Sequence, residues 1–342
     1  MKLAIGARPY DGPWGGGNRF VAAICEALAA QGHTVVHELA DGDIDIILIM
    51  DPRKRVPNVS FDAGAILRYL QFTNPNAIVV HRVNECDERK GEPFINDKLV
   101  RANYVADATV FIAAWLADLP VWRRHLRQPW FVVRNGADQR IFNAARFQPW
   151  NGDGPLKLVT HHWGYHPMKG FDIYSAIDRM MGDPRWSGRL SFTYVGQLPR
   201  DFKFANARYI APLDGQALAD ELASHHAYVT GTINEPAGMH HIEGAMSGLP
   251  LLYRQSGALP EYCDGFGVSF TGPDDFETAL TKLMAEYRPL LTRLPAYPWT
   301  AVRMTHDWIA LFEKLHSQRD DLLKHRRLWR QPLRALATQI PV

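Results

Sequence analysis

Short apolar runs alternate with amphipathic segments along most of the chain. In the first part, we expect strands at 2–5, 34–39, 44–50, 77–81, 109–112 and 131–133. Several of these runs are almost continuously apolar, as strands buried on both faces of a parallel sheet are. Between the first two runs, apolar residues recur at helical spacing from Phe20 to Leu28, and Gly32 ends the pattern. The alternation predicts a doubly wound α/β sheet.

The alternation stops at 148–155, where QPWNGDGP is rich in glycine and proline, and then starts again. Further strands are expected at 156–160, 190–195, 227–230 and 250–253, and helices at 215–225, 236–247 and 274–287. From Trp299 the pattern is helical through His316. We therefore predict an N-terminal Rossmann-like domain (1–148), a C-terminal Rossmann-like domain (149–300), and a C-terminal helix with a basic tail (301–342).

Composition fits a globular protein and gives no reason to expect a nucleic-acid partner. A length of 342 residues suggests about two domains, and 46% hydrophobic and 22% charged residues are ordinary values. Lysine and arginine number 38 against 36 acids, so the net charge creates no field that attracts nucleic acid. The cysteines, Cys25, Cys86 and Cys263, lie far apart, which argues against a disulfide framework or a thiolate metal site. A reduced, cytoplasmic setting fits this pattern.

No segment is expected to cross a membrane. The N-terminus MKLAIGARPY lacks the apolar core of a signal peptide, and the apolar run Ile44–Met50 carries Asp45 and is too short to span a bilayer. After Asp321 the chain contains no acid, and its basic residues are Lys324, Arg326, Arg327, Arg330 and Arg334. With Leu328 and Trp329 beside them, this tail fits either a solvated terminal helix or a peripheral contact with an anionic membrane.

The densest chemical signal lies at 234–263, which reads NEPAGMHHIEGAMSGLPLLYRQSGALPEYC. Glu235 and Glu243 stand eight positions apart, with Pro236 and Gly238 between them. Pro236 fits the first turn of a helix, where its missing N–H costs nothing. Gly238 lets a ligand approach the backbone, and the unpaired N–H groups of a helix start attract an anion. The segment predicts a phosphate-facing helix start with one carboxylate before it and one inside it.

This segment resembles the donor-site signature of family-4 retaining glycosyltransferases of the GT-B fold, in which seven residues separate two glutamates. Four further pieces agree in order: GGGNRF at 15–20, His81 after a strand, NGADQRIF at 135–142, and MKGFD at 168–172. The resemblance covers about residues 1–315. It implies two Rossmann-like doubly wound α/β domains that face a cleft, with a C-terminal helix that crosses back to the first domain.

The resemblance also implies roles in donor binding for the second half of the chain. Lys169 would stabilise the departing diphosphate. Glu235 would approach hydroxyls of the donor sugar and Glu243 those of the ribose, since an ionised carboxylate accepts two hydroxyl protons well. The backbone N–H groups expected to face the sugar or phosphate are those of Gly238, Met239 and His240.

The chain departs from the family pattern at the diphosphate clamp. Family members usually pair the lysine with an arginine a few residues earlier, but 160–167 reads THHWGYHP and contains no arginine. Three alternatives stay open. One of His161, His162 and His166 replaces the arginine, Arg19 does so from the first domain, or one cation suffices.

In the first half, the resemblance points to a glycine loop and a histidine. Gly16, Gly17 and Arg19 follow the first strand, where the family's loop approaches phosphate or acceptor, although an ordinary turn has the same composition. His81 is expected at the end of its strand, where it either contacts the transferred sugar or is structural. Asn135 matches the family's interdomain loop, but Asn-Gly is also a generic turn.

The implied activity is retaining transfer of a hexose from a nucleoside diphosphate sugar to a glycan, lipid-linked or small-molecule acceptor. We expect no cofactor beyond this co-substrate and no metal, because no Asp-x-Asp stands at a plausible diphosphate site. Two alternatives stay open. A GT-B sugar-nucleotide epimerase would consume the donor without an acceptor, and a non-catalytic nucleotide-sugar-binding module would explain the missing arginine.

Overall fold

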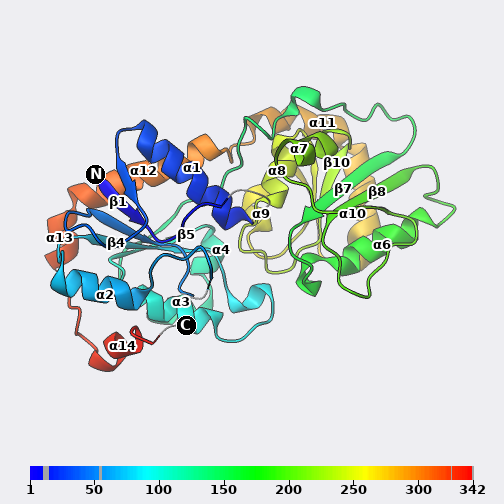
Figure 1. The fold of residues 1–342 in the computed structure, drawn as a ribbon. Helices are drawn as coiled ribbons and strands as arrows, with labels where there is room; N and C mark the ends of the chain where they lie inside the picture. The colour runs from blue at the N-terminus through cyan, green and yellow to red at the C-terminus, as the bar shows by residue number, and fades with distance from the viewer. Residues whose placement is uncertain (11–14, 54–55, 325, 341–342) are drawn as a thin grey trace. The chain divides into compact units, whose positions relative to one another are not determined.

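The computed structural model describes residues 1–10, 15–53, 56–324 and 326–340. The chain forms two compact units, Met1–Arg134 together with Val302–Val342, and Asn135–Ala301 (Figure 1). The boundary between them lies earlier than the expected one after 148, because residues from Asn135 on belong to the second unit. Ala137, for example, forms a β-bridge with Thr300. The breaker-rich stretch at 148–155 is therefore a loop inside the second unit.

The first unit is built on one parallel sheet with the strand order β2-β1-β3-β4-β5-β6. Its strands are β1 (Lys2–Ile5), β2 (Thr34–Val36), β3 (Ile46–Ile49), β4 (Ile78–Val83), β5 (Ala108–Phe111) and β6 (Trp130–Val132). Its helices are α1 (Gly16–Ala30), α2 (Ala63–Phe72), α3 (Ile95–Ala102), α4 (Ala114–Ala117), α5 (Pro120–His125), α12 (Ala301–Ser317), α13 (Arg319–Lys324) and α14 (Pro332–Ala337). Two 3₁₀ turns, η1 (Asp87–Arg89) and η2 (Asn103–Val105), complete it.

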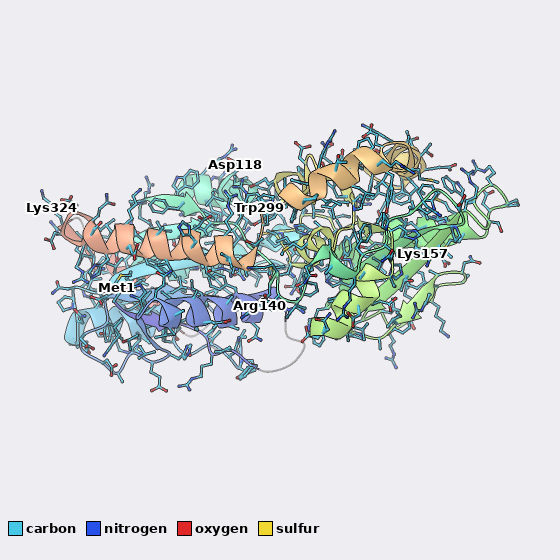
Figure 2. The ribbon with its side chains drawn as sticks, turned by 90° about the horizontal axis from the view of Figure 1, so that it is seen from above. Met1, Asp118, Arg140, Lys157, Trp299 and Lys324 are labelled. Atoms are coloured by element: carbon cyan, nitrogen blue, oxygen red, sulfur yellow. The ribbon has the colours of Figure 1, made fainter. Side chains whose placement is uncertain are left out.

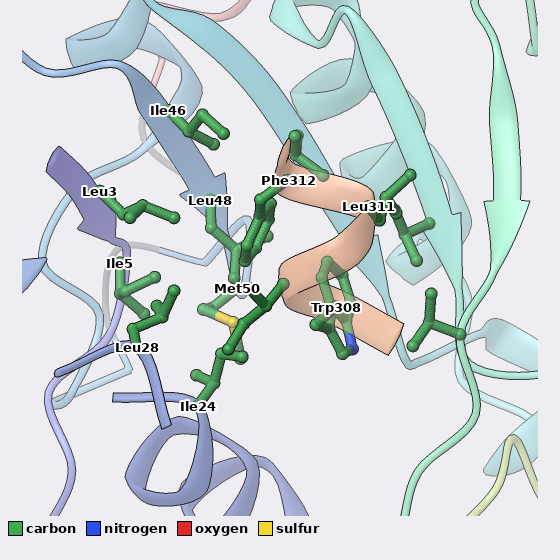
Figure 3. Close-up of a cluster of buried hydrophobic side chains, with 14 of the residues drawn as sticks. Leu3, Ile5, Ile24, Leu28, Ile46, Leu48, Met50, Trp308, Leu311 and Phe312 are labelled. Carbon is green, nitrogen blue, oxygen red and sulfur yellow. The ribbon is translucent and has the colours of Figure 1, made fainter. Parts of the chain in front are cut away.

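The end of the chain returns to this first unit, as the sequence predicts. Helix α12 buries an apolar face that includes Trp308 and Phe312, and these side chains join strand residues such as Leu48 and the α1 residue Ile24 in one core (Figure 3). The Trp308 ring also packs edge-on against Phe20, with 5.4 Å between ring centroids. Helices α12 and α13 run along the unit toward Lys324 (Figure 2).

The second unit repeats the architecture with the strand order β12-β11-β10-β7-β8-β9. Its strands are β7 (Leu156–His162), β8 (Leu190–Gly196), β9 (Arg208–Ile210), β10 (Ala227–Thr230), β11 (Leu251–Arg254) and β12 (Gly267–Phe270). Its helices are α6 (Phe171–Met181), α7 (Gly215–Ala223), α8 (His240–Met246), α9 (Leu259–Cys263), α10 (Pro273–Ala285) and α11 (Tyr287–Arg293). The 3₁₀ turns are η3 (Ala144–Arg146), η4 (Pro167–Lys169) and η5 (Leu294–Ala296).

The strand order of the second unit reverses between β7 and β10. From β7 the chain proceeds outward through β8 and β9, and from β10 it proceeds the opposite way through β11 and β12, with all pairs parallel. Ligands of open α/β sheets bind outside the carboxyl ends of the strands at such a reversal. The loops that leave β7 and β10 carry Lys169 and Glu235, respectively. The topology therefore places both predicted side chains at the binding edge of one sheet.

No helix in the described part of the chain is long and apolar enough to cross a bilayer.

Candidate active site

A buried ion pair joins the two loops at the reversal of strand order. Nζ of Lys169 donates a hydrogen bond to Oε2 of Glu235 at 2.8 Å. The Glu235 side chain is 1% exposed and that of Lys169 is 11% exposed, so Lys169 is not an ordinary surface lysine. Charges removed from water are stable only when they are paired, and removing one partner leaves the other uncompensated. Two of the residues singled out in the sequence are thus brought together inside one unit, in direct contact with each other.

The loop before α8 differs from the helix start that the sequence predicts. We expected helix from Pro236 on, but α8 begins only at His240. Asn234 and Ala237 have positive φ angles of 51° and 117°, respectively, which a right-handed helix does not contain. Glu235 and Pro236 therefore lie in an irregular loop, and the expectation that Pro236 occupies a first helical turn is wrong.

This loop is shaped around the Glu235 carboxylate. Its Oε1 accepts a hydrogen bond from the backbone N–H of Gly238 at 3.0 Å, while its Oε2 accepts from Lys169. A Cβ atom at position 238 would lie 2.7 Å from Nδ1 of His240 and 2.9 Å from Oε1 of Glu235, so a larger residue would displace these two side chains. The N–H of Gly238, which we expected to face a sugar or phosphate, is thus bonded to Glu235 in this structure. Ligand contacts of the Met239 and His240 N–H groups stay predictions.

The second candidate carboxylate, Glu243, is hydrogen-bonded to a histidine of β7. Oε2 of Glu243 lies 2.8 Å from Nε2 of His161, and both side chains are buried. An ionised carboxylate only accepts hydrogen bonds, so Nε2 of His161 carries the proton. Nδ1 of the same ring is 3.2 Å from the hydroxyl of Tyr228. The Glu243 head is therefore fixed by a histidine 82 positions away in the sequence.

The other two histidines of the THHWGYHP stretch are also engaged. Nε2 of His162 lies 2.5 Å from the hydroxyl of Tyr174. Burial, helped by the nearby Lys169 charge, holds the pKa of His162 well below its ordinary value, so its ring is neutral. Nδ1 of His166 accepts a hydrogen bond from the N–H of Met168 and caps η4. His162 therefore does not supply a permanent second cation.

A buried group of rings lies under this site. Nε2 of His240 is 3.0 Å from Oγ1 of Thr230, and its ring centroid is 4.7 Å from that of His162. Burial holds the pKa of His240 well below its ordinary value. The His241 ring is fully buried against Tyr262, and neither of its nitrogens has a hydrogen-bond partner among the described residues. In the part of the chain that the structure covers, no group of three metal-ligating side chains is arranged to hold an ion.

Two buried histidines of the second unit, His241 and His225 (the latter bonded to Thr193), predict that acid destabilises this unit. Burial lowers the pKa of both His225 and His241 from 6.5 to about 4. Between pH 6.5 and 4 the unfolded chain therefore binds protons that the folded chain does not. Each histidine then removes about 1.4 kcal/mol of stability per pH unit as the pH falls through this window.

Urea unfolding of the wild type at pH 7.5, 6, 5 and 4.5 measures this loss. The variant His241→Leu is the matched control. Its unfolding free energy should depend less steeply on pH than that of the wild type, because about one fewer proton is taken up on unfolding. A free energy of unfolding that stays constant between pH 6.5 and 5 would contradict the predicted burial of neutral imidazoles.

The first unit holds four of the other candidates. His81 does not end its strand, since β4 continues to Val83, and the expectation of a strand-end histidine is wrong. Its ring is fully buried, Nδ1 lies 2.9 Å from Oδ1 of Asn103, and burial lowers the pKa to about 4. Gly16 and Gly17 are the first residues of α1 instead of a loop before it, and Arg19 follows in the same turn. Sugar or phosphate contacts of these residues stay predictions.

Asn135 belongs to the second unit, where it supports the Glu235 loop. Its Nδ2 donates to the carbonyl of Ala237 at 2.8 Å, and its backbone N–H donates to the hydroxyl of Tyr262 at 2.9 Å. The side chain thus helps to hold the unusual backbone at Ala237. A direct contact of Asn135 with the donor stays a prediction.

Sequence reasoning missed three residues around this site. Tyr228 and Tyr262 hold His161 and Asn135, respectively, yet each looks like an ordinary core aromatic in the sequence. Arg254, the last residue of β11, is buried and pairs with Asp172 in α6. The sequence could have predicted this buried ion pair, because an arginine ends the apolar run PLLYR.

The chain matches no family model and no curated protein by sequence. Solved structures resemble it over nearly its whole length. Sucrose-phosphate synthase from Thermosynechococcus elongatus has a TM-score of 0.64 at 14% identity, covering 93% of this chain and 99% of that one. HepE from Anabaena in complex with UDP-glucose has a TM-score of 0.65 at 12% identity, covering 92% and 100%. A glycosyltransferase from Rickettsia africae has a TM-score of 0.61 at 12% identity, covering 95% and 99%.

These likenesses confirm the expected α/β fold of two Rossmann-like units, the GT-B fold. With identities this low they establish the fold alone. Membership of family 4 within that fold stays a prediction.

Proposed function

We propose that this protein is a retaining glycosyltransferase that transfers a hexose from a nucleoside diphosphate sugar to a sugar-containing, lipid-linked or small-molecule acceptor. The observation that carries the proposal is the buried Lys169–Glu235 pair at the carboxyl ends of β7 and β10. A cation and a carboxylate held out of water at a strand-order reversal are suited to an anionic, hydroxyl-rich ligand. All three cysteines are free, which supports a reduced, cytoplasmic setting.

In this proposal Lys169 acts on the leaving group. Negative charge develops on the diphosphate as the bond from the anomeric carbon to phosphate oxygen breaks. A fixed donor in a water-poor site stabilises such charge by roughly 3–4 kcal/mol. Glu235 accepts from hydroxyls of the transferred sugar, and Glu243, oriented by His161, accepts from the ribose.

Retention requires no carboxylate nucleophile in this proposal. The acceptor hydroxyl attacks the anomeric carbon from the face that the diphosphate leaves. The new carbon–oxygen bond forms as the old one breaks, and the leaving phosphate oxygen takes the acceptor proton. Two similar structures suggest which donors to test first, since HepE was solved with UDP-glucose and pneumococcal GtfA with UDP and GlcNAc.

One observation favours a non-catalytic binding module as a second candidate. The stretch 160–167 contains no arginine, and two of its histidines are already bonded, His161 to Glu243 and His162 to Tyr174. A clamp with one cation binds a diphosphate but stabilises its departure less than a clamp with two.

A donor panel tests the proposal. The wild type is incubated with UDP-, GDP- and ADP-sugars, and release of nucleoside diphosphate is measured with and without an acceptor panel. We expect release that rises when the right acceptor is added. Donor binding by calorimetry without release under any acceptor would favour the binding module. An isomerised, untransferred sugar in the product NMR spectrum would instead favour the epimerase.

A further inference from the structure

The basic end of the chain is a folded part of the first unit. We define the C-terminal tail as residues 319–324 and 326–340. Nε of Arg326 donates to Oδ1 of Asp107 at 2.9 Å, and its two other nitrogens donate to the carbonyls of Pro75 and Ala77 at 2.6 Å each. An arginine side chain that is 9% exposed and bonds to one carboxylate and two carbonyls is an anchor. Arg326, one of the basic residues of the tail, therefore bonds to the body of the first unit.

Beyond this anchor, one side of the tail is seated on α2. Ala335 is fully buried, and Thr338 is nearly so. A Cβ atom on Gly64 would lie 2.6 Å from the carbonyl oxygen of Thr338, so the glycine allows the two backbones to touch. Nε2 of Gln339 also donates to the carbonyl of Gly64 at 3.3 Å. Because this side is fixed, the side chains opposite to it are held outward.

The outward side carries an apolar ridge. We define the tail ridge as Trp329, Leu333, Leu336 and Ile340, which are 45%, 83%, 54% and 62% exposed, respectively. Leu333 and Leu336 stand three residues apart and share one side of α14, while Trp329 and Ile340 lie in the segments that flank this helix. Large apolar side chains that gather on a surface, instead of being scattered, mark an interaction site.

The tail also carries basic side chains. Lys324, Arg327, Arg330 and Arg334 of the tail are all exposed, and the tail has no acid after Asp321. From the body of the unit, Arg68 bonds to Gln339 and Arg101 to the carbonyl of Ala337. The acid beside the hollow between tail and body, Asp62, is buried as the cap of α2. Asp320 and Asp321 are exposed at the start of the tail, but from Arg326 on its described residues combine exposed apolar side chains with basic ones and include no acid.

We propose that the tail ridge and its basic rim form a docking surface for an anionic lipid bilayer. The four apolar side chains enter the boundary between headgroups and acyl chains, and the basic side chains remain among the anionic headgroups. A second copy of this surface would bring like charges together, and a nucleic acid would leave the apolar ridge in water. The lipid surface satisfies both features at once. This docking does not depend on the proposed transfer activity.

Vesicle co-sedimentation of the full chain tests the proposal. Vesicles of phosphatidylcholine with phosphatidylglycerol at about one third are compared with pure phosphatidylcholine vesicles. We expect partitioning at least ~10-fold stronger on the anionic vesicles at low salt, since anionic headgroups attract each basic residue near the surface. Raising the salt should remove most of this difference.

Two double variants separate the apolar and basic contributions. Leu333→Ser with Leu336→Ser should weaken partitioning at least ~10-fold on anionic vesicles, because the buried hydrocarbon is lost. Arg327→Gln with Arg334→Gln should weaken it by a similar factor and flatten the salt dependence. Val302→Ser, which changes an exposed apolar residue of α12 outside the tail, is the matched control and should bind as the wild type does. Equal thermal unfolding of all variants shows that the fold is kept.

Several results would overturn the proposal. Equal binding of the wild type and both double variants would show that the tail does not contact the membrane. Equal binding to anionic and neutral vesicles would remove the role of the basic rim. A concentration-dependent dimer in sedimentation equilibrium that Leu333→Ser dissolves, without vesicle binding, would assign the ridge to a second copy. Vesicle binding by a protein that fails the donor panel would leave the docking surface intact and reject only the transferase.

Discussion

Replacement of Lys169 by alanine lowers the rate of donor cleavage at least ~100-fold, because a fixed cation no longer meets the charge that develops on the leaving diphosphate. The effect should fall mainly on kcat, since the contact strengthens as the leaving group departs. Steady-state measurement of nucleoside diphosphate release checks the prediction, once the donor panel has identified a substrate.

The matched control for this variant is Lys157→Ala. Lys157 lies on β7, the strand that leads to the Lys169 loop, but its side chain is exposed (Figure 2). It should leave the rate within about twofold of the wild type. Because Lys169→Ala also leaves Glu235 buried without its cation, the folded fraction of each variant is measured by thermal unfolding and the rate is corrected for it. A fully folded Lys169→Ala protein with the wild-type rate would contradict the proposal that Lys169 stabilises the leaving diphosphate.

Replacement of Glu235 by alanine should lower the same rate at least ~100-fold. Two effects combine, since the donor sugar loses its acceptor and the N–H of Gly238 loses the carboxylate that shapes the loop. Glu235→Gln separates them, because the amide oxygen can still accept from Gly238 but no longer pairs as an anion with Lys169. We expect Glu235→Gln to keep the wild-type stability more closely than Glu235→Ala, and to remain slow.

A double-mutant cycle tests whether the pair acts as one unit. Lys169→Ala combined with Glu235→Ala should cost less than the sum of the two single variants in activation free energy, since residues in direct contact are coupled. It should also recover stability, because no uncompensated buried charge remains. Fully additive losses would mean that the two side chains act independently, and wild-type rates in both single variants would remove the site assignment.

Buried strands were the most predictable elements of this fold. The ranges expected for β1 and β10, 2–5 and 227–230, are the observed ones. By contrast, β9 and β12 were not predicted. Both lie at edges of the second sheet, where β9 is largely exposed and β12 alternates between buried and half-buried positions. Edge strands lack the continuous apolar run that reveals a central strand, so the local pattern does not show them.

The start of α8 shows where local preference fails. A proline followed by small and apolar residues favours a helix from Pro236, but the loop is held open by contacts distant in sequence. Glu235 is paired with Lys169, 66 positions away, and the carbonyl of Ala237 accepts from Asn135, 102 positions away. Tertiary contacts of this kind override helix propensity, which is a weak preference.

By itself the sequence determined the α/β class and the two-sheet organisation, because apolar periodicity is a local property of the chain. It also singled out Glu235, Glu243 and Lys169 as candidates, through short motifs that resemble a known donor-site signature. Only the tertiary structure decided which partner each side chain takes. The pairing of Glu243 with His161 depends on how the strands are ordered in the sheet, and no spacing along the chain encodes that order. Likewise, the composition of the tail left its state open, and the anchoring of Arg326 on Asp107 is a contact that forms only once the first unit has folded.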